Sequence, residues 1–387
     1  MWSACPTFRR GNFHIGTALT PHLIILGIRG LPAAHGGFET FAERLAPYFD
    51  KHGWRVTVYC QGSGSNEREE DEWNGIHRIH IPVKREGSVG TIEFDIKCVR
   101  DVQNIEGTVL TLGYNTGFLS AWLRLCGRRN FINMDGLEWK RAKYSWGARA
   151  YLWVNERLAA WAGTVLIADH PVIADHLASR ASRDKIQVIP YGSDGIDGAS
   201  AALLLPLGLE PYRFFTLIAR PEPENSVLDI VRAFSAAPRG AKLVVLGKYE
   251  RSHAYQASVL DAAGSEVVFP GAIYEREVLA SLRFYSIAYV HGHRVGGTNP
   301  SLVEALGASN AVIAHDNAFN RWVAGEAGLY FKDTEDCAAH IERLCVDEKF
   351  RAVLQVAARE RWLQEFTWDA ILRRYREVLN DSRGFKG

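Results

Sequence analysis

The chain has 387 residues, with 45 Lys and Arg residues against 44 Asp and Glu residues and a net charge of +1. This balance removes the strongest argument for a nucleic-acid-binding protein. Apolar residues make up 47% of the chain and aromatic residues 11%, a composition typical of a soluble globular protein and not of a disordered one. The length favours two or three domains of ordinary size.

The cysteines and the N-terminus bear on the cellular compartment. The six cysteines lie far apart, without a CxxC pair or a His partner at zinc spacing, and predict neither a disulfide framework nor a structural metal. The first twenty residues lack the apolar segment of a secretory signal, and no later window reaches about 18 uninterrupted apolar residues. We therefore expect residues 1–20 to be an extension, the protein to be cytoplasmic, and any membrane contact to be peripheral.

Short β-branched runs in the first half predict buried strands, with helical patterns between several of them. The runs are Leu23–Ile28, Arg55–Cys60, Arg78–Val83, Thr108–Leu112, Phe131–Met134, Thr164–Ala168 and Lys185–Ile189. The clearest helix carries Phe38, Phe41, Leu45 and Phe49 on one stripe, and Pro47 should kink or shorten its end. Strands and helices in alternation predict a parallel sheet covered on both faces.

The same alternation resumes in the second half, after a linker-like stretch rich in Gly, Ser, Ala and Leu. Predicted strands are Phe214–Ala219, Lys242–Leu246, Val267–Phe269, Ile287–Val290 and Ala311–Ala314, and predicted helices are Val227–Ala237, Glu275–Tyr285 and Ser301–Gly307. The tail from Phe350 to Leu379 is helical in pattern. Its apolar residues available for docking are Trp362, Phe366, Trp368, Ile371 and Tyr375.

These patterns predict an α/β fold with two doubly wound, Rossmann-like domains. We place the domains at residues 21–195 and 213–355, the linker at 196–212, and C-terminal helices at 356–387. Ligand binding is expected in the cleft at the carboxyl ends of both sheets.

Two glycine-rich loops run from a predicted strand into a predicted helix. In the first loop, Gly36 and Gly37 precede the helix and would let backbone N–H groups approach a phosphate. The loop does not read GxGxxG, which weakens a dinucleotide-dehydrogenase interpretation, and a plain tight turn is the alternative.

The second loop starts at His291 and leads into the helix around Ser301. Asn299 suits the helix cap and Pro300 the first turn. The free N–H groups of Ser301 and Leu302 would then face a phosphate. Glu304 could accept hydrogen bonds from sugar hydroxyls, or it could simply complement the helix dipole.

Arg220 is the third candidate, because it follows the first strand of the second domain. An Arg at the carboxyl end of that strand could neutralise a diphosphate leaving group. The alternative is a local ion pair with Glu222 or Glu224.

Five segments together resemble the family 4 glycosyltransferases of the GT-B fold, and are most similar to the branch of rhamnosyltransferases that build bacterial surface polysaccharides. They are GIRGLPAAHGGFETFAERL, INMDGLEWKRAKY, ADHPVIADHL, ARPEPEN and GGTNPSLVEALG, in the expected order from about Leu23 to about Phe331. The resemblance implies a nucleotide-sugar held mainly by the second domain, an acceptor bound by the first, and a final helix that returns to the first domain.

The resemblance also assigns residues to the donor site. The helix-terminus glycines fall on Gly36 and Gly37, the diphosphate-binding Arg on Arg220, and the ribose-binding Glu on Glu304. The amide cradle falls on Asn299 to Leu302, next to Thr298. The metal-independent reaction with retention of configuration is implied in the same way, and we expect no cofactor.

The chain departs from the family pattern in three places. Gly296 stands where a first glutamate is common, so its donor-sugar role is vacant or is taken by His293 or by the backbone of Gly296 and Gly297. The Lys that often follows the Arg is absent, and Lys248 either supplies that charge or is a solvated surface residue. No His matches the one in the first domain, and Asp135 and Glu138 lie nearest. We predict that Asp135 positions the acceptor or the sugar hydroxyls and that Glu138, Lys140 and Arg141 lie on the acceptor side, although an Asp-Gly pair such as Asp135-Gly136 is also a common turn.

Basic and aromatic residues gather between Arg124 and Trp153, among them Lys140, Arg141 and Lys143. This pattern suits an anionic membrane surface, where a polyprenyl-linked glycan acceptor would be presented, although a solvated face beside a core helix would look the same. We predict a hexosyltransferase that moves a sugar, with rhamnose as the best guess, onto such an acceptor. The alternatives are a nucleotide-sugar epimerase or phosphorylase of the same fold, and a catalytically silent scaffold of a polysaccharide assembly complex.

Overall fold

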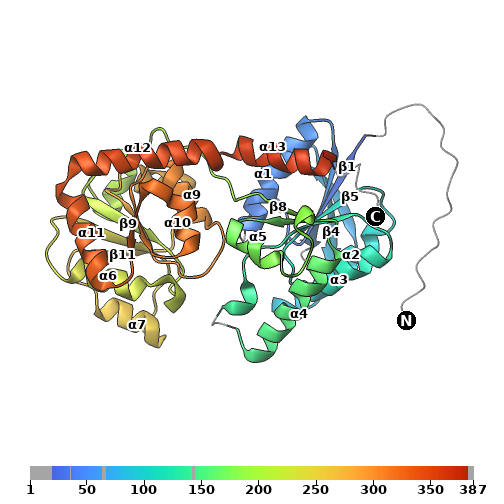
Figure 1. Ribbon diagram of the computed structural model, residues 1–387, viewed down its shortest axis with the longest axis horizontal. Coiled ribbons are helices and arrows are strands. Elements are labelled where there is room, and N and C mark those ends of the chain that lie inside the picture. The colour runs from blue at the N-terminus through green and yellow to red at the C-terminus, as the bar shows by residue number, and fades with distance from the viewer. Residues whose placement is uncertain (1–19, 35, 63–66, 142–143, 382–387) are drawn as a thin grey trace. The chain divides into compact units, whose positions relative to one another are not determined.

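The computed structural model describes residues 20–34, 36–62, 67–141 and 144–381, so almost all of the predicted N-terminal extension lies outside the described residues. The described chain forms two compact units (Figure 1). Most of the first unit lies before Ile189, and most of the second is Ile189–Arg374. Residues 375–381 belong with the first unit.

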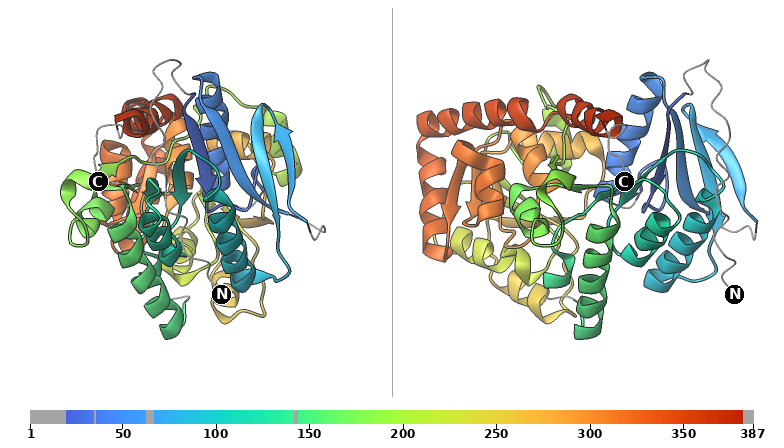
Figure 2. Two further views of the ribbon diagram at one scale, coloured as in Figure 1. Left: turned by 90° about the vertical axis from the view of Figure 1, so that its right-hand side faces the viewer. Right: turned by 45° about the vertical axis from the view of Figure 1, so that its right-hand side comes forward.

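The sheet of the first unit has eight strands in the order β3-β4-β2-β1-β5-β6-β7-β8. The strands are β1 (His22–Leu26), β2 (Arg55–Gly62), β3 (Glu69–Trp73), β4 (Ile76–Pro82), β5 (Thr108–Leu112), β6 (Asn130–Asn133), β7 (Val165–Ala168) and β8 (Ile186–Val188). Neighbours pair in parallel except β3 and β4, which form an antiparallel edge pair (light blue in Figure 2). The seven predicted strands are confirmed. Sequence analysis missed β3, because its side chains are acidic and exposed apart from Trp73.

The main helices of the first unit follow strands, as the alternation predicts. They are α1 (Gly37–Lys51), α2 (Gly87–Val102), α3 (Gly117–Leu125), α4 (Trp146–Ala162) and α5 (Pro171–Leu177). Phe41, Leu45 and Phe49 of α1 are buried, and each apolar side chain stabilises the fold by about 1.5–3 kcal/mol. Pro47 does not shorten α1, which continues to Lys51. The buried apolar stripe of the helix continues past the proline to Phe49.

The second sheet has six parallel strands in the order β11-β10-β9-β12-β13-β14. The strands are β9 (Phe214–Ile218), β10 (Lys242–Leu246), β11 (Val267–Gly271), β12 (Tyr289–His291), β13 (Val312–His315) and β14 (Gly328–Phe331). All five predicted strands are confirmed, and β14 is an additional edge strand.

Helices cover both faces of this second sheet (Figure 1). Phe234 and Ile341 pack on one face, and Leu306 and Trp362 pack on the other. The α-helices of this unit are α6 (Val227–Ser235), α7 (Ala254–Asp261), α8 (Arg276–Phe284), α9 (Pro300–Gly307), α10 (Ala318–Ala324), α11 (Thr334–Val346) and α12 (Glu348–Glu365). The last helix, α13 (Trp368–Asp381), begins in the second unit and continues into the first. The stretch expected as a linker contains the 3-10 helix η3 (Ala201–Leu207), whose Leu204 is buried in the second unit.

The C-terminal helices dock through the residues that the sequence marks for that purpose, all five of which are buried. In the second unit, Trp362 Nε1 donates a hydrogen bond to Ser193 Oγ at 2.9 Å. In the first unit, Asn133 Nδ2 donates to the Tyr375 hydroxyl at 2.8 Å, and the Tyr375 ring lies 4.7 Å from that of Phe41. None of the described helices is both long and apolar enough to cross a membrane.

Candidate functional site

In the second unit, β9 and β12 are neighbours, so the segments that follow them share one edge of the sheet. Arg220 follows β9, and the glycine-rich loop from Gly292 to Asn299 follows β12 and leads into α9. Both lie at the carboxyl ends of parallel strands, where ligands of doubly wound folds bind. The fold therefore brings the predicted Arg and the predicted loop together.

Arg220 is exposed, and its guanidinium has no hydrogen-bond or ion-pair partner among the described residues. Only its backbone carbonyl is used, as the acceptor for Asn225 Nδ2 at 2.9 Å. The local ion pair with Glu222 or Glu224 does not form in this structure. Glu224 Oε1 instead lies 3.8 Å from Arg141 Nη1, and Arg141 clusters with the second unit. A partnerless guanidinium at this edge is suited to an anionic ligand.

Two stacked histidines flank the start of the loop. The rings of His291 and His293 lie 4.3 Å apart and are nearly parallel, with 9° between their planes. Both ring nitrogens of His291 and Nδ1 of His293 are buried without a hydrogen-bond partner among the described residues. Burial lowers the pKa of His293 to about 3, with a further contribution from the positive charge of Arg220. His293 is therefore neutral at physiological pH.

The start of α9 is capped by its own residues. The Asn299 side chain accepts hydrogen bonds from the Ser301 N–H at 3.1 Å and from the Ser301 hydroxyl at 2.8 Å. The Leu302 N–H donates to the Asn299 carbonyl at 3.1 Å. The predicted cap at Asn299 and first-turn Pro300 are confirmed. The expectation that the Ser301 and Leu302 N–H groups are free is wrong, because the cap satisfies both.

Glu304 is held by a residue that sequence analysis did not select. Its Oε2 accepts a hydrogen bond from Arg283 Nη2 in an ion pair, and the Arg283 side chain is only 7% exposed while that of Glu304 is 38% exposed. Arg283 lies at the end of α8, and no spacing rule links it to Glu304. The ion pair fixes one carboxylate oxygen of Glu304 while the side chain remains accessible.

The glycines of this loop have different surroundings. A Cβ on Gly292 would lie 2.1 Å from the Asn225 carbonyl oxygen, so the fold itself requires glycine there. A Cβ on Gly296 would meet no atom within 4 Å. Gly297 and Thr298 continue the loop, and Thr298 is buried. Packing within the protein thus gives no reason for glycine at 296, and close approach of a ligand would give one.

Lys248, a further member of the predicted donor set, is exposed. Its side chain is 81% exposed, and its Nζ pairs with Glu250 Oε1 at 2.5 Å. The hydrogen bond with Glu250 raises the pKa of Lys248. This position matches the solvated lysine that sequence analysis kept as the alternative.

In the first unit, Gly36 caps α1 without a side-chain hydrogen bond, and Gly37 begins the helix. Both are exposed. The Glu39 carboxylate lies beneath them, since a Cβ on Gly36 would sit 3.1 Å from Glu39 Oε2. This helix start carries a carboxylate where the predicted phosphate would bind.

The residues predicted for the acceptor side lie around the 3-10 turn η1 (Glu138–Lys140). Asp135 adopts a left-handed backbone with φ 52°, and its Oδ1 accepts a hydrogen bond from the Gly136 N–H at 2.8 Å. Glu138 is buried and accepts a hydrogen bond from the Tyr144 hydroxyl at 3.3 Å. Lys140 is exposed, with its Nζ 5.4 Å from the centre of the Trp139 ring. Asp135 thus adopts a left-handed conformation that Asp tolerates in loops, and its role toward a ligand stays a prediction.

Comparison with known proteins bears mainly on the fold. A family model described as "Domain of unknown function (DUF1972)" matches residues 20–194. None of the curated proteins matches the chain at a significant level. The solved structures include sucrose-phosphate synthase from Thermosynechococcus elongatus, to which the chain is 18% identical with a TM-score of 0.78, covering 93% of this chain and 98% of that one.

Two other solved structures are similar in extent. Anabaena HepE, solved in complex with UDP and glucose, is 15% identical with a TM-score of 0.74 over 93% of this chain and 99% of that one. A glycosyltransferase from Rickettsia africae is 12% identical with a TM-score of 0.71 over 95% and 100%. The chain has the GT-B fold. The predicted fold class is thereby confirmed. Sequence identities this low establish the fold and not the activity.

Proposed function

We propose that this GT-B protein is a glycosyltransferase that takes a sugar from a nucleoside-diphosphate donor bound at the carboxyl edge of the second sheet. The observation that carries the proposal is the exposed Arg220 guanidinium without a partner, next to the loop that leads into α9. HepE, which shares the fold, was solved with UDP-glucose. A donor of this class would supply the anion that Arg220 lacks.

The chemistry requires positive charge on the departing diphosphate, because negative charge develops there as the bond to the sugar breaks. Arg220 would supply that charge by bidentate hydrogen bonding. The Ser301 and Leu302 N–H groups would contribute only if a phosphate displaced the Asn299 cap. Glu304, held by Arg283, would accept hydrogen bonds from the ribose hydroxyls.

His293 and Gly296 would contact the donor sugar in place of the missing carboxylate. Since His293 is neutral, its imidazole would form ordinary hydrogen bonds with sugar hydroxyls and would not compete with Arg220 for the diphosphate. The open space at Gly296 would let the sugar approach the backbone closely. Retention of anomeric configuration belongs to the same proposal and rests on the family resemblance.

We further propose that the transfer needs no metal ion, because Arg220 takes the place of a cation at the diphosphate. Activity should survive extensive dialysis against EDTA. Loss of activity that Mg²⁺ or Mn²⁺ restores would contradict this part of the proposal.

The proposal has three further parts. The transferred sugar is rhamnose, the acceptor is a polyprenyl-linked glycan, and the protein acts at the inner face of the cytoplasmic membrane. The support for a membrane contact lies on α4, where Trp146, Trp153 and Trp161 are 86%, 41% and 49% exposed. Their spacing of seven and eight residues puts them on one helix face. Arg157 stacks on Trp153, with its guanidinium carbon 3.2 Å from the ring centre. Basic and interfacial aromatic residues together suit anionic lipid.

The deciding experiment measures release of nucleoside diphosphate by the purified protein from dTDP-rhamnose, UDP-glucose, UDP-galactose and GDP-mannose, with and without a lipid-linked glycan extract. A transferase releases the diphosphate from one donor faster when the extract is added. Conversion of a donor without acceptor would instead indicate an epimerase. Silence across the panel, together with no nucleotide binding, would indicate a scaffold and overturn the proposal.

A further inference from the structure

The helix α12, which runs along one side of the second unit (Figure 1), is apolar on two sides. Its inner side packs in the core of that unit through Leu354, Ala358 and Trp362. On its outer side, Val353, Val356 and Leu363 are 64%, 58% and 54% exposed. A surface helix normally carries polar residues opposite its buried side. The core of its own unit therefore does not explain the outer side of α12.

The next helix shows the ordinary pattern. The exposed residues of α13 are Asp369, Arg373, Glu377, Asn380 and Asp381, all of them polar. Single exposed apolar residues are common on protein surfaces and need no explanation. On α12, however, the exposed apolar residues share one side of the helix, and Val346 just before the helix is 73% exposed as well. Apolar residues that gather in this way indicate an interaction surface.

Two charged residues complete the outer side of α12. Lys349 and Glu360 are exposed, and neither side chain has an ion-pair or hydrogen-bond partner among the described residues. Together with the apolar residues they recur at alternating intervals of four and three residues, in the order Lys349, Val353, Val356, Glu360 and Leu363. This is the spacing of the seam between two helices of a coiled coil. We call these five residues the outer stripe.

The order of residues along the outer stripe is self-complementary. When a second copy of α12 runs antiparallel with its Val356 opposite Val353, Lys349 of each copy lies opposite Glu360 of the other, because both pairs are centred between residues 354 and 355. A parallel pair in register would instead place Lys349 opposite Lys349 and Glu360 opposite Glu360. Like charges repel at this separation and opposite charges attract, so the stripe suits an antiparallel copy of itself.

The residues around this seam suit the same pairing. Leu363 lies opposite the start of the second α12, where Val346 is exposed. Ala352 and Ala357 flank the two valines on either side, and their small side chains let a second helix approach closely. The 18 residues of α12 span about 27 Å. One helix pair of this length belongs to the small class of interfaces, which bury less than about 1,200 Å² and give weak complexes.

We propose that the outer stripe of α12 is an interface between two copies of this chain, packed antiparallel with Val353 against Val356 and Lys349 against Glu360. The dimer forms at high protein concentration, because a single helix pair is a small interface. The proposal goes beyond donor binding and sugar transfer and depends on neither.

Sedimentation equilibrium of the purified full chain tests the proposal, at concentrations from about 1 to about 300 µM that cover the affinity expected of a small interface. We expect the wild type to shift from the mass of one chain to twice that mass within this range. Lys349→Glu and Glu360→Lys should each weaken dimerisation at least about tenfold, because each places like charges opposite one another twice in the dimer. Val356→Ser should also weaken it about tenfold or more, since buried apolar surface is lost from both copies.

An equimolar mixture of the Lys349→Glu and Glu360→Lys proteins tests the register of the pair. A dimer with one chain of each kind again places Glu opposite Lys at both ends of the stripe, so the mixture should dimerise within about threefold of the wild-type affinity. Arg373→Glu is the matched control, because Arg373 is an exposed basic residue of α13 without an ion-pair partner among the described residues. This variant should dimerise as the wild type does.

The proposal is overturned if the wild type stays at the mass of one chain, or if Lys349→Glu and Glu360→Lys leave the dimer unchanged. A dimer that both variants weaken and that their mixture does not restore would contradict the antiparallel pairing. If the wild type stays monomeric and Val356→Ser lowers binding to anionic vesicles, the outer stripe contacts lipid and not a second copy. The substituted side chains are exposed, so a change in mass does not reflect misfolding.

Discussion

The two units present the same local motif, a glycine-rich loop that joins a strand to a helix, with opposite chemistry. In the second unit, Asn299 caps α9 and the unpaired Arg220 lies at the same edge of the sheet. In the first unit, Gly36 caps α1 without a side-chain bond, and the Glu39 carboxylate lies beside it. A strand–glycine–helix motif therefore indicates where a ligand binds, while side chains from other elements decide its charge.

The largest expected effect comes from removing the cation of the second unit. Arg220→Ala should lower kcat/KM for the donor by about 10²–10³-fold, as loss of one group that stabilises transition-state charge typically does. Arg213→Ala is the matched control, because Arg213 is exposed at the opposite end of β9. Steady-state kinetics of diphosphate release measure both variants. Equal activity of the Arg220→Ala and Arg213→Ala proteins would contradict the proposed donor binding at this edge of the second sheet.

Two substitutions of Glu304 can separate its contribution to stability, through the ion pair with Arg283, from its contribution to nucleotide binding. Glu304→Ala leaves the buried Arg283 guanidinium without its carboxylate, which should lower the free energy of unfolding by about 2–3 kcal/mol in urea titrations. Glu304→Gln keeps a hydrogen-bond acceptor and should lose less than about 1 kcal/mol.

Nucleotide affinity of the Gln variant then reports on the ribose contact. If Glu304 binds the ribose, Glu304→Gln weakens UDP binding in calorimetry although the protein remains nearly as stable as the wild type. Unchanged UDP affinity together with the stability loss of Glu304→Ala would make Glu304 a purely structural partner of Arg283.

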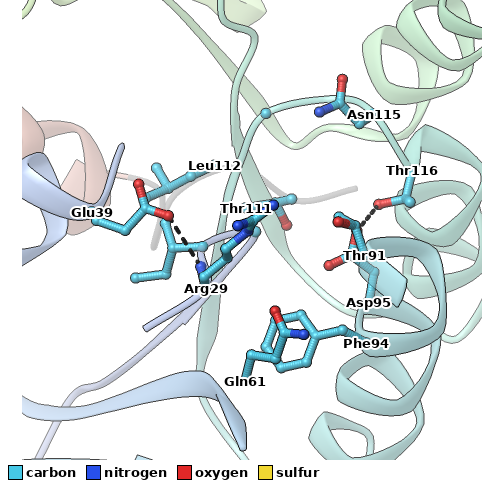
Figure 3. A pocket seen from close by; sticks show the side chains of 13 residues that line it. Arg29, Glu39, Gln61, Thr91, Phe94, Asp95, Thr111, Leu112, Asn115 and Thr116 are labelled. Atoms are coloured by element: carbon cyan, nitrogen blue, oxygen red, sulfur yellow. Dashed lines mark hydrogen bonds between the residues drawn. The ribbon is translucent and has the colours of Figure 1, made fainter. Parts of the chain in front are cut away.

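Asp95 lines a cavity of the first unit (Figure 3), and burial raises its pKa to about 6, which gives this unit a pH dependence. The folded protein holds the proton up to about pH 6, while the unfolded chain releases it near 3.8, so the stability that protonated Asp95 confers is lost as pH rises between these values. Asp95→Asn cannot ionise and should be more stable than the wild type by about 1–3 kcal/mol at pH 7. At pH 4 the wild-type carboxyl is already protonated in the folded protein, so removing its ionisation should not increase stability. Urea unfolding at pH 4 to 7 measures the difference. A gain that is equal at every pH would contradict the assignment to Asp95.

Sequence reasoning found the elements whose signal is local. Buried runs such as Thr108–Leu112 became strands at the predicted bounds, and the Asn299-Pro300 pair began a helix as its capping chemistry requires. The edge strand β3 carries four acidic residues in succession, so it lacks the alternation of apolar residues that predicts a strand.

The candidate site was only partly predictable for the same reason. Arg220 and the α9 loop stand out because each follows a strand. Arg283 and Asp95 lie within helices, where charged residues are usually solvated. Only the tertiary fold brings Arg283 to Glu304 and Asp95 to the Thr116 hydroxyl. Glu39 could have been noticed, since it belongs to the same glycine-rich segment, but its burial beneath Gly36 depends on the turn geometry.

The smallest expected effect concerns the exposed aromatic face of α4, which belongs to the first unit. Replacing Trp146, Trp153 and Trp161 by Ser should weaken sedimentation with vesicles that contain anionic lipid by about tenfold, because interfacial aromatic side chains contribute through buried apolar area.

Arg149→Glu should lower vesicle affinity about fivefold or more, since each basic residue near such a surface contributes about 1 kcal/mol. Of the predicted basic residues Lys140, Arg141 and Lys143, the last lies outside the described residues. The exposed Tyr274 of the second unit is the matched control: Tyr274→Ser should leave vesicle binding unchanged. If the α4 variants bind vesicles as the wild type does, the exposed face of α4 is an ordinary solvated surface, and the difference between the two units is confined to their sheet edges.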